Sequence, residues 1–199
     1  LPVYYLTAPS EASSNLNRYD GIKYGLSDNK HQNSWEVIKN TRSNFGEEVK
    51  RRILLGTFAL SSGYYDEYYG KAQKVRGMIV HSFKEVFKEY DILISPTSPI
   101  TAFDIGAMID DPLTMYQNDI CTMPANIAGI PAISIPCGIS DGLPVGFQIM
   151  GPHFSDLKII NIAKEFEKHI ELNILKLTFN LEYFFSCLLY TSDAADEGL

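Results

Sequence analysis

Residues 132–150 restrict the fold of this chain more than any other segment does. Apolar residues alternate with smaller or polar ones over 132–136 and again over 145–150. Asp141-Gly142 lies between these two runs, and this pair of residues favours the tight turn of a β-hairpin. The segment therefore predicts two strands in quick succession, each with one face suited to burial.

Helical patterns surround the predicted hairpin. Residues 47–60 combine strong helix formers with apolar positions, and Gly63 follows as a breaker. From Asp66 to Phe87 apolar residues recur at three- and four-residue spacing, the pattern of an amphipathic helix. A short apolar strand over 91–96, stopped by its proline, follows directly. Helices mixed with short strands predict an α/β or α+β layer fold.

Capping residues predict where three further helices begin. Ser34 is expected to cap one helix, and Ser155-Asp156 is expected to cap the last one. Asp111-Pro112 is a cap followed by proline at the first helical position, which opens a helix to about Ile120. Pro124 is expected to kink or end that helix, because proline cannot donate the backbone hydrogen bond.

Both ends of the chain are unusual. Residues 1–6 are interpreted as a strand entered halfway, and the chain opens on Leu1 rather than Met. We therefore expect a fragment that is incomplete at its N-terminus. After Lys168 the sequence changes character, and residues 169–199 are interpreted as a tail of read-through, frameshifted or artefactual origin. The apolar stretch 172–190 contains polar and charged side chains that are costly in hydrocarbon, so no membrane span is predicted.

Composition and motifs exclude several classes of function. Twenty-four acidic residues against seventeen basic ones give a net charge of −7, so we predict no DNA binding. Three cysteines do not make a disulfide scaffold and suit a reducing compartment. The four histidines lack metal-ligand spacing, so no metal site is predicted. The glycine-rich signatures of dinucleotide and P-loop binding are also absent from the sequence.

No catalytic nucleophile is apparent in the sequence. Ser61-Ser62-Gly63 contains a tempting serine pair, but the termination of a helix explains these residues. Cys121 and Cys137 carry no nucleophile signature, and buried inert thiols are the simpler interpretation.

Two charged residues have apolar neighbours at helical spacing. Arg52 is surrounded in this way by small and apolar residues, and Asp119 by methionine, tyrosine and threonine. An ionised group on such a face needs a partner. For Arg52, local pairing with Glu48 one helical turn earlier is the simpler interpretation. For Asp119, a structural and a functional interpretation stay equally open.

Motifs along the chain then resemble one family in order. Pro124-Ala125-Asn126 and Leu143-Pro144-Val145-Gly146 are similar to segments of the amidase signature family in general. Glu11-Ala12-Ser13-Ser14-Asn15 and Lys50-Arg51-Arg52-Ile53 resemble its tRNA-dependent branch, the A subunits of bacterial and organellar glutamyl-tRNA(Gln) amidotransferases. The resemblance covers residues 1–168 and implies the C-terminal part of an α/β domain, with a mixed twisted sheet flanked by helices.

The resemblance implies a glutamine-hydrolysing enzyme. Members of the family attack a carboxamide with a Ser–cis-Ser–Lys triad, and the A subunits pass the released ammonia to a partner subunit. That partner uses ATP and Mg to activate Glu-tRNA(Gln). The triad is expected upstream of Leu1, so this chain alone is predicted to be inactive. The implied partners are glutamine, the B and C subunits and, through the complex, Glu-tRNA(Gln); the implied location is the bacterial cytoplasm or an organelle.

The resemblance also assigns three glutamine-binding positions to Tyr4, Arg52 and Asp119. A zwitterionic amino acid presents a carboxylate and an ammonium, which need a cation and an anion opposite them. Arg52 can bind the carboxylate through two hydrogen bonds. Asp119 can bind the ammonium, and Tyr4 can add a hydroxyl contact. We therefore expect Arg52 and Asp119 to converge in one cavity.

Two other functions stay open. One is a stand-alone amidase of the same family that acts on small amides, and the other is a catalytically silent binding or assembly module. Genes for the B and C subunits would favour the amidotransferase over the stand-alone amidase. An upstream Ser-Ser-Gly-rich segment with a lysine would favour either enzyme over the silent module.

Overall fold

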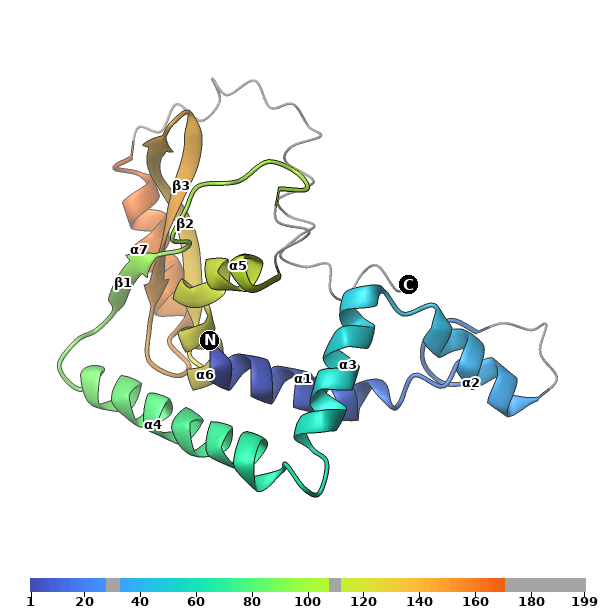
Figure 1. Ribbon diagram of the computed structural model, residues 1–199. Coiled ribbons are helices and arrows are strands. Elements are labelled where there is room, and N and C mark those ends of the chain that lie inside the picture. Colours follow the sequence, from blue (N-terminus) through green and yellow to red (C-terminus); the bar gives the residue numbers. More distant parts are fainter. Residues whose placement is uncertain (28–32, 108–111, 171–199) are drawn as a thin grey trace. The chain divides into compact units, whose positions relative to one another are not determined.

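The computed structural model describes residues 1–27, 33–107 and 112–170 (Figure 1). These residues divide into two compact units, one of residues 2–73 and one that begins at Lys74. The positions of the two units relative to each other are not determined.

The unit of residues 2–73 is helical in its described part. Its helices are α1 (Pro2–Leu16), α2 (Ser34–Ser43) and α3 (Glu47–Ala59), followed by the π-helical turn η1 (Asp66–Gly70). The predicted helix over 47–60 is thereby confirmed as α3.

The N-terminal residues form a helix, so the strand predicted over residues 1–6 was wrong. Pro2 is the first residue of α1, a position where its fixed φ suits a helix and its missing N–H is not needed. Pro9 lies inside the same helix and supplies no amide hydrogen for the preceding turn. The buried Ser10 hydroxyl donates to the Leu6 carbonyl oxygen, 2.6 Å away.

A glycine allows α1 and α3 to pack closely. Gly56 on α3 lies directly against the backbone of Pro9 on α1, where a larger residue would collide. The Ser13 and Thr57 hydroxyls, from the same two helices, are 2.9 Å apart and share a hydrogen bond. These contacts fix the relative placement of α1 and α3.

The loop before α2 is attached to that helix by a buried threonine. Thr41 is 2% exposed, and its hydroxyl donates to the Leu26 carbonyl oxygen over 2.6 Å. Asp20 organises the same loop, because its carboxylate accepts hydrogen bonds from the amides of Lys23 and Ile22. These bonds stabilise the charged form and lower the pKa of Asp20.

The start of α2 differs by one residue from the prediction. Asn33, not Ser34, is the N-cap, and its side-chain oxygen accepts a hydrogen bond from the Trp35 amide at 2.9 Å. Both residue types make good caps, so the sequence alone does not separate two adjacent candidates.

Further along the chain, helices alternate with strands. The elements are α4 (Lys71–Val86), β1 (Leu93–Pro96), α5 (Pro112–Gln117), the 3₁₀ turn η2 (Asn118–Cys121), α6 (Met123–Ala128), β2 (Ala132–Ser140), β3 (Leu143–Met150) and α7 (Asp156–Glu167). The amphipathic helix predicted from Asp66 is confirmed as η1 followed by α4. The predicted strand over 91–96 and both strands of the hairpin are also confirmed.

Two predictions about helix ends need correction. Pro124 does not end a helix but lies in the first turn of α6, where proline is well tolerated. The helix opened by Pro112 already changes to the 3₁₀ turn η2 after Gln117. Ser155 does occupy the N-cap of α7, although its side chain makes no capping hydrogen bond. The predicted cap Asp111 lies outside the described residues.

The described strands form an antiparallel sheet in the order β1-β3-β2. Asp141 and Gly142 join β2 to β3 with φ angles of 52° and 79°, which are the positive values that a tight hairpin turn requires. The predicted α/β layering is thus present, with helices beside a sheet (Figure 1).

Alternate residues of the sheet face two different helices. Ile135 and Ile149 pack with Ile159 and Ala163 of α7 on one face. On the other face Met150 packs with Ala125 and Ala128 of α6. The period of two seen in the sequence therefore separates two core clusters.

Candidate functional site

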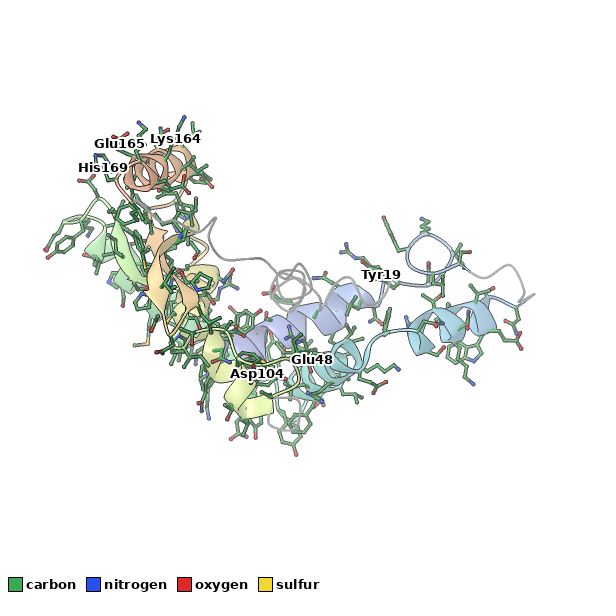
Figure 2. The ribbon with its side chains drawn as sticks, turned by 90° about the horizontal axis from the view of Figure 1, so that it is seen from above. Tyr19, Glu48, Asp104, Lys164, Glu165 and His169 are labelled. Atoms are coloured by element: carbon green, nitrogen blue, oxygen red, sulfur yellow. The ribbon has the colours of Figure 1, made fainter. Side chains whose placement is uncertain are left out.

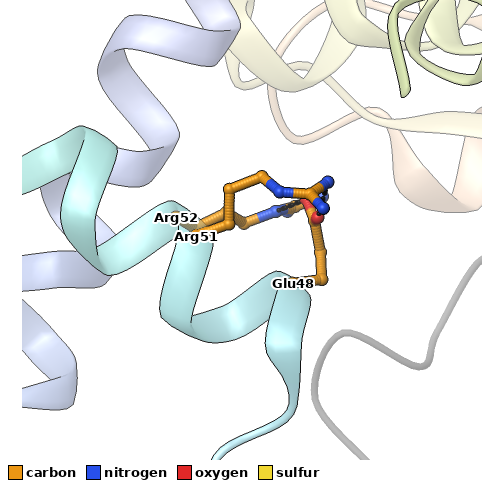
Figure 3. Close-up of polar contacts among 3 residues, drawn as sticks. All are labelled: Glu48, Arg51 and Arg52. Carbon is orange, nitrogen blue, oxygen red and sulfur yellow. Dashed lines mark hydrogen bonds and ion pairs between the residues drawn. The ribbon is translucent and has the colours of Figure 1, made fainter. Parts of the chain in front are cut away.

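Arg52 lies on α3 and pairs with Glu48, as the local interpretation predicts (Figure 3). Its Nε is 3.0 Å from Glu48 Oε1, and its side chain is only 28% exposed. Arg51 binds the other oxygen of the same carboxylate at 2.9 Å, with a side chain that is 56% exposed. One carboxylate thus orients two guanidinium groups.

The first turn of α3 contains a further ion pair. Lys50 Nζ donates to Glu47 Oε1 at 2.9 Å, and this hydrogen bond, together with the positive charge of Lys50, lowers the pKa of Glu47. Acidic groups in the first turn of a helix are also favoured by its dipole. Residues 47–52 contain three basic and two acidic side chains, so this end of α3 retains a net positive charge.

Tyr4 lies on α1, the helix that packs closely against α3. Its ring meets the ring of Tyr5 edge to face, with centroids 5.4 Å apart. Tyr4 and Arg52 are therefore carried by two helices of the same unit whose packing is fixed by Gly56.

Asp119 is an exposed residue of the 3₁₀ turn η2, in the other unit of the chain. Its carbonyl oxygen accepts hydrogen bonds from both the amide and the hydroxyl of Thr122, each at 3.1 Å. The convergence of Asp119 with Arg52 stays a prediction, because the two residues belong to units whose relative positions are not determined.

A cavity of about 380 Å³ lies beside the turn that carries Asp119. Its polar lining consists of uncharged side chains that can donate or accept hydrogen bonds: Thr97, Thr122, Asn126, Ser134 and Gln148. Such a lining suits an uncharged polar group and offers no countercharge to an ion.

Gln148 was not identified as a candidate from the sequence. It is 2% exposed, and its side-chain nitrogen donates to the Ser95 hydroxyl at 2.9 Å and to the Cys121 carbonyl oxygen. The alternation gave no signal for it, because Gln148 lies on the face of the predicted strand opposite the apolar residues 145, 147 and 149.

The described histidines are all exposed side chains. His169 lies just beyond α7, near Lys164 and Glu165 (Figure 2), and its Nδ1 is 2.8 Å from the Glu165 carbonyl oxygen. Cys137 is exposed and Cys121 is partly exposed, so the expectation that both thiols are buried was wrong. Cys137 lies at an irregularity of β2, between Pro136 and Gly138, where the pairing with β3 shifts register.

The described ranges contain neither a metal site nor a membrane span. Within 1–27, 33–107 and 112–170, no three His, Cys, Asp or Glu side chains are arranged to hold a metal ion. The same ranges contain no helix with the length and hydropathy needed to cross a membrane. The apolar stretch 172–190, His31 and Cys187 lie outside these ranges.

The sequence and structure are similar to those of known amidases. The family described as Amidase matches residues 1–160. Over 169 residues the chain is 57% identical to the A subunit of the glutamyl-tRNA(Gln) amidotransferase of Shouchella clausii, a match that covers 84% of this chain and 35% of that protein. The chain therefore spans about a third of the length of the curated relatives it matches.

Solved structures agree with this similarity. The crystal structure of the glutamyl-tRNA(Gln) amidotransferase A subunit from Thermotoga maritima matches with a TM-score of 0.53 and 44% identity, over 81% of this chain and 38% of that one. The crystal structure of an amidase matches with a TM-score of 0.61 and 19% identity, over 84% of this chain and 35% of that one. The second match supports the fold alone.

Proposed function

The chain belongs to the amidase family, and we propose that it is the C-terminal portion of the A subunit of a glutamyl-tRNA(Gln) amidotransferase. The observation that carries this proposal is the 57% identity, over 84% of the chain, to relatives that bear this name. In the proposed reaction the complete subunit hydrolyses glutamine to glutamate and ammonia. Its catalytic triad lies in the part of the subunit that precedes residue 1.

The contribution of this chain is to bind the amino-acid end of glutamine. Arg52 binds the α-carboxylate, Asp119 the α-ammonium, and the Tyr4 hydroxyl adds a further contact. The pairing of Arg52 with Glu48 supports its part, because a guanidinium held through Nε at 3.0 Å is oriented before substrate arrives. An arginine has five N–H donors, so one side of the group can be held while another binds a carboxylate.

The two charges also explain selectivity. An amide that lacks the α-carboxylate and α-ammonium would make neither of the bonds proposed for Arg52 and Asp119. Leaving polar groups of a site unpaired is among the strongest means of rejecting an analogue. The site therefore selects glutamine over aliphatic or aromatic amides.

The proposed partners are the B and C subunits and, through the assembled enzyme, Glu-tRNA(Gln). The B subunit uses ATP and Mg to activate the tRNA-bound glutamate, and it receives the ammonia. In this scheme no nucleotide or metal ion binds to residues of the present chain.

The decisive experiment compares two adjacent arginines in the complete, assembled enzyme. Arg52→Ala is expected to raise the KM for glutamine roughly 10- to 100-fold, the range for losing hydrogen bonds to a charged group. Amidation supported by free ammonia should be unchanged, because ammonia bypasses the glutamine site.

Arg51→Ala is the matched control, because Arg51 shares the Glu48 carboxylate but is more exposed. Arg51→Ala should change neither the KM for glutamine nor the amidation supported by free ammonia. Equal losses with glutamine and ammonia, or equal effects of the two substitutions, would contradict the assignment of Arg52. A complete enzyme without glutamine-dependent amidation of Glu-tRNA(Gln) would contradict the proposed function itself.

A further inference from the structure

We propose that Gln148 is a positioning residue, whose buried side chain holds the turn that carries Asp119 at a fixed place on the sheet. The inference concerns the site proposed above and rests on that proposed function. All the residues involved belong to one unit of the chain.

Gln148 is placed to connect separate elements. It lies on β3, the middle strand of the described sheet, directly opposite Ser95 of β1 and Ser134 of β2. Directly opposed residues of antiparallel strands present their side chains on the same face. This is also the face against which α6 packs, through Met150 at the next position of the same side.

The hydrogen bonds of Gln148 identify the element that it anchors. Its Nε2 donates to the Ser95 hydroxyl at 2.9 Å and to the carbonyl oxygen of Cys121. A backbone carbonyl can only accept, so the side-chain nitrogen must face Cys121. Cys121 is the last residue of η2, two positions after Asp119.

The turn itself is short. A 3₁₀ segment of four residues has few internal hydrogen bonds, and their geometry is poorer than in an α-helix. The bonds from Thr122 to the Asp119 carbonyl oxygen keep the turn closed, but they do not attach it to the sheet. The Gln148 bond to Cys121 attaches the last residue of the turn directly to the middle strand of the described sheet, two residues from Asp119.

Burial makes this attachment specific. Gln148 is 2% exposed, and its replacement by an apolar residue would remove the side-chain donor of the Cys121 carbonyl oxygen. A leucine of similar volume would fill the space but could not bind the turn. The geometry therefore predicts that Gln148→Leu releases η2 while the sheet stays folded.

The first test measures amide hydrogen exchange in the 199-residue chain. Gln148→Leu is expected to speed exchange at the Thr122 amide, which donates within the turn, roughly 5- to 10-fold. Ser95→Ala is the matched control, because it removes the other strong acceptor of Gln148 but leaves the bond to the turn. Unchanged exchange in Gln148→Leu, or the same increase in Ser95→Ala, would overturn the anchoring role.

The second test measures kinetics in the complete, assembled enzyme. Gln148→Leu should raise the KM for glutamine roughly 5- to 10-fold, with ammonia-supported amidation unchanged. Ser95→Ala should change neither quantity. If Asp119→Asn raises this KM and Gln148→Leu does not, the positioning role is wrong. If Asp119→Asn itself leaves the KM unchanged, the proposed function of Asp119 fails, and the exchange result alone decides whether Gln148 anchors the turn.

Discussion

Gly56 lies so close to Pro9 that a Cβ carbon at residue 56 would stand 2.0 Å from the Pro9 carbonyl oxygen. Gly56→Ala is therefore expected to lower the free energy of unfolding by about 2–3 kcal/mol, because α1 and α3 must move apart. The better helix propensity of alanine offsets only about 1 kcal/mol of this cost. Urea unfolding of the 199-residue chain measures the difference.

Gly77 provides the control for this substitution. It lies inside α4, and a Cβ there would meet no atom within 4 Å. Gly77→Ala should stabilise the chain by up to about 1 kcal/mol, the helix propensity gain alone. If both alanine variants were stabilised alike, the close approach of α1 to α3 would be refuted.

At Gly142 in the hairpin turn there is room for a side chain, but the backbone angle disfavours any residue other than glycine. Its φ is 79°, and a Cβ there would meet no atom within 4 Å. Gly142→Ala is expected to cost about 1–2 kcal/mol in the free energy of unfolding, as strain alone. Gly138→Ala, on β2 with equally open space but without a positive φ, should show no such cost. Thermal unfolding of the two variants measures the difference.

The hydrogen bonds to the Asp20 carboxylate predict that its contribution to the stability of the fold depends on pH. The amides of Lys23 and Ile22 lower the pKa of its carboxyl in the folded chain, below the value of about 3.9 expected when unfolded. The ion therefore stabilises the fold above pH ~4, and this contribution is lost as the pH falls through the folded pKa.

Asp20→Asn tests this dependence through the Tm as a function of pH. The wild-type chain should melt at a higher temperature than the variant at about pH 6, and the gap should narrow steadily below about pH 4. A gap that stayed constant down to about pH 2 would show that the charge of Asp20 does not carry the effect.

Glu48 is expected to influence glutamine binding through Arg52. Glu48→Gln weakens the hold on Arg52 Nε and should raise the KM for glutamine roughly threefold in the assembled enzyme, as expected for a partly exposed ion pair. Glu47→Gln is the control, because Glu47 pairs with Lys50 in the same helical turn. An equal effect of both substitutions would attribute the change to the helix end rather than to Arg52.

The sequence predicts best those features that depend on neighbouring residues. Asp141-Gly142 and the alternation on either side define the hairpin without any distant contact. The pairing of Glu48 with Arg52 follows equally from four-residue helical spacing. The strand prediction for residues 1–6 was wrong because a short apolar run fits a strand or a helix. Pro2 favours the start of a helix as much as a strand edge.

Features that depend on long-range contacts were not predictable in this way. The acceptors of Gln148 lie 53 and 27 residues away in sequence, at Ser95 and Cys121. No local pattern indicates that these atoms meet in the folded chain. The proposed meeting of Arg52 and Asp119 is a long-range relationship of the same kind, which a resemblance can suggest but spacing cannot.

The strand order β1-β3-β2 has a consequence for folding during synthesis on the ribosome. In the described sheet the middle strand is also the last to be synthesised, so Leu93 emerges long before its partner Met150 exists. The β2–β3 hairpin closes over a two-residue turn, so its local contacts are expected to form first, and β1 then pairs with β3. Until that moment the nascent β1 backbone presents unpaired amide and carbonyl groups that could pair with another strand, which makes it a site of possible aggregation.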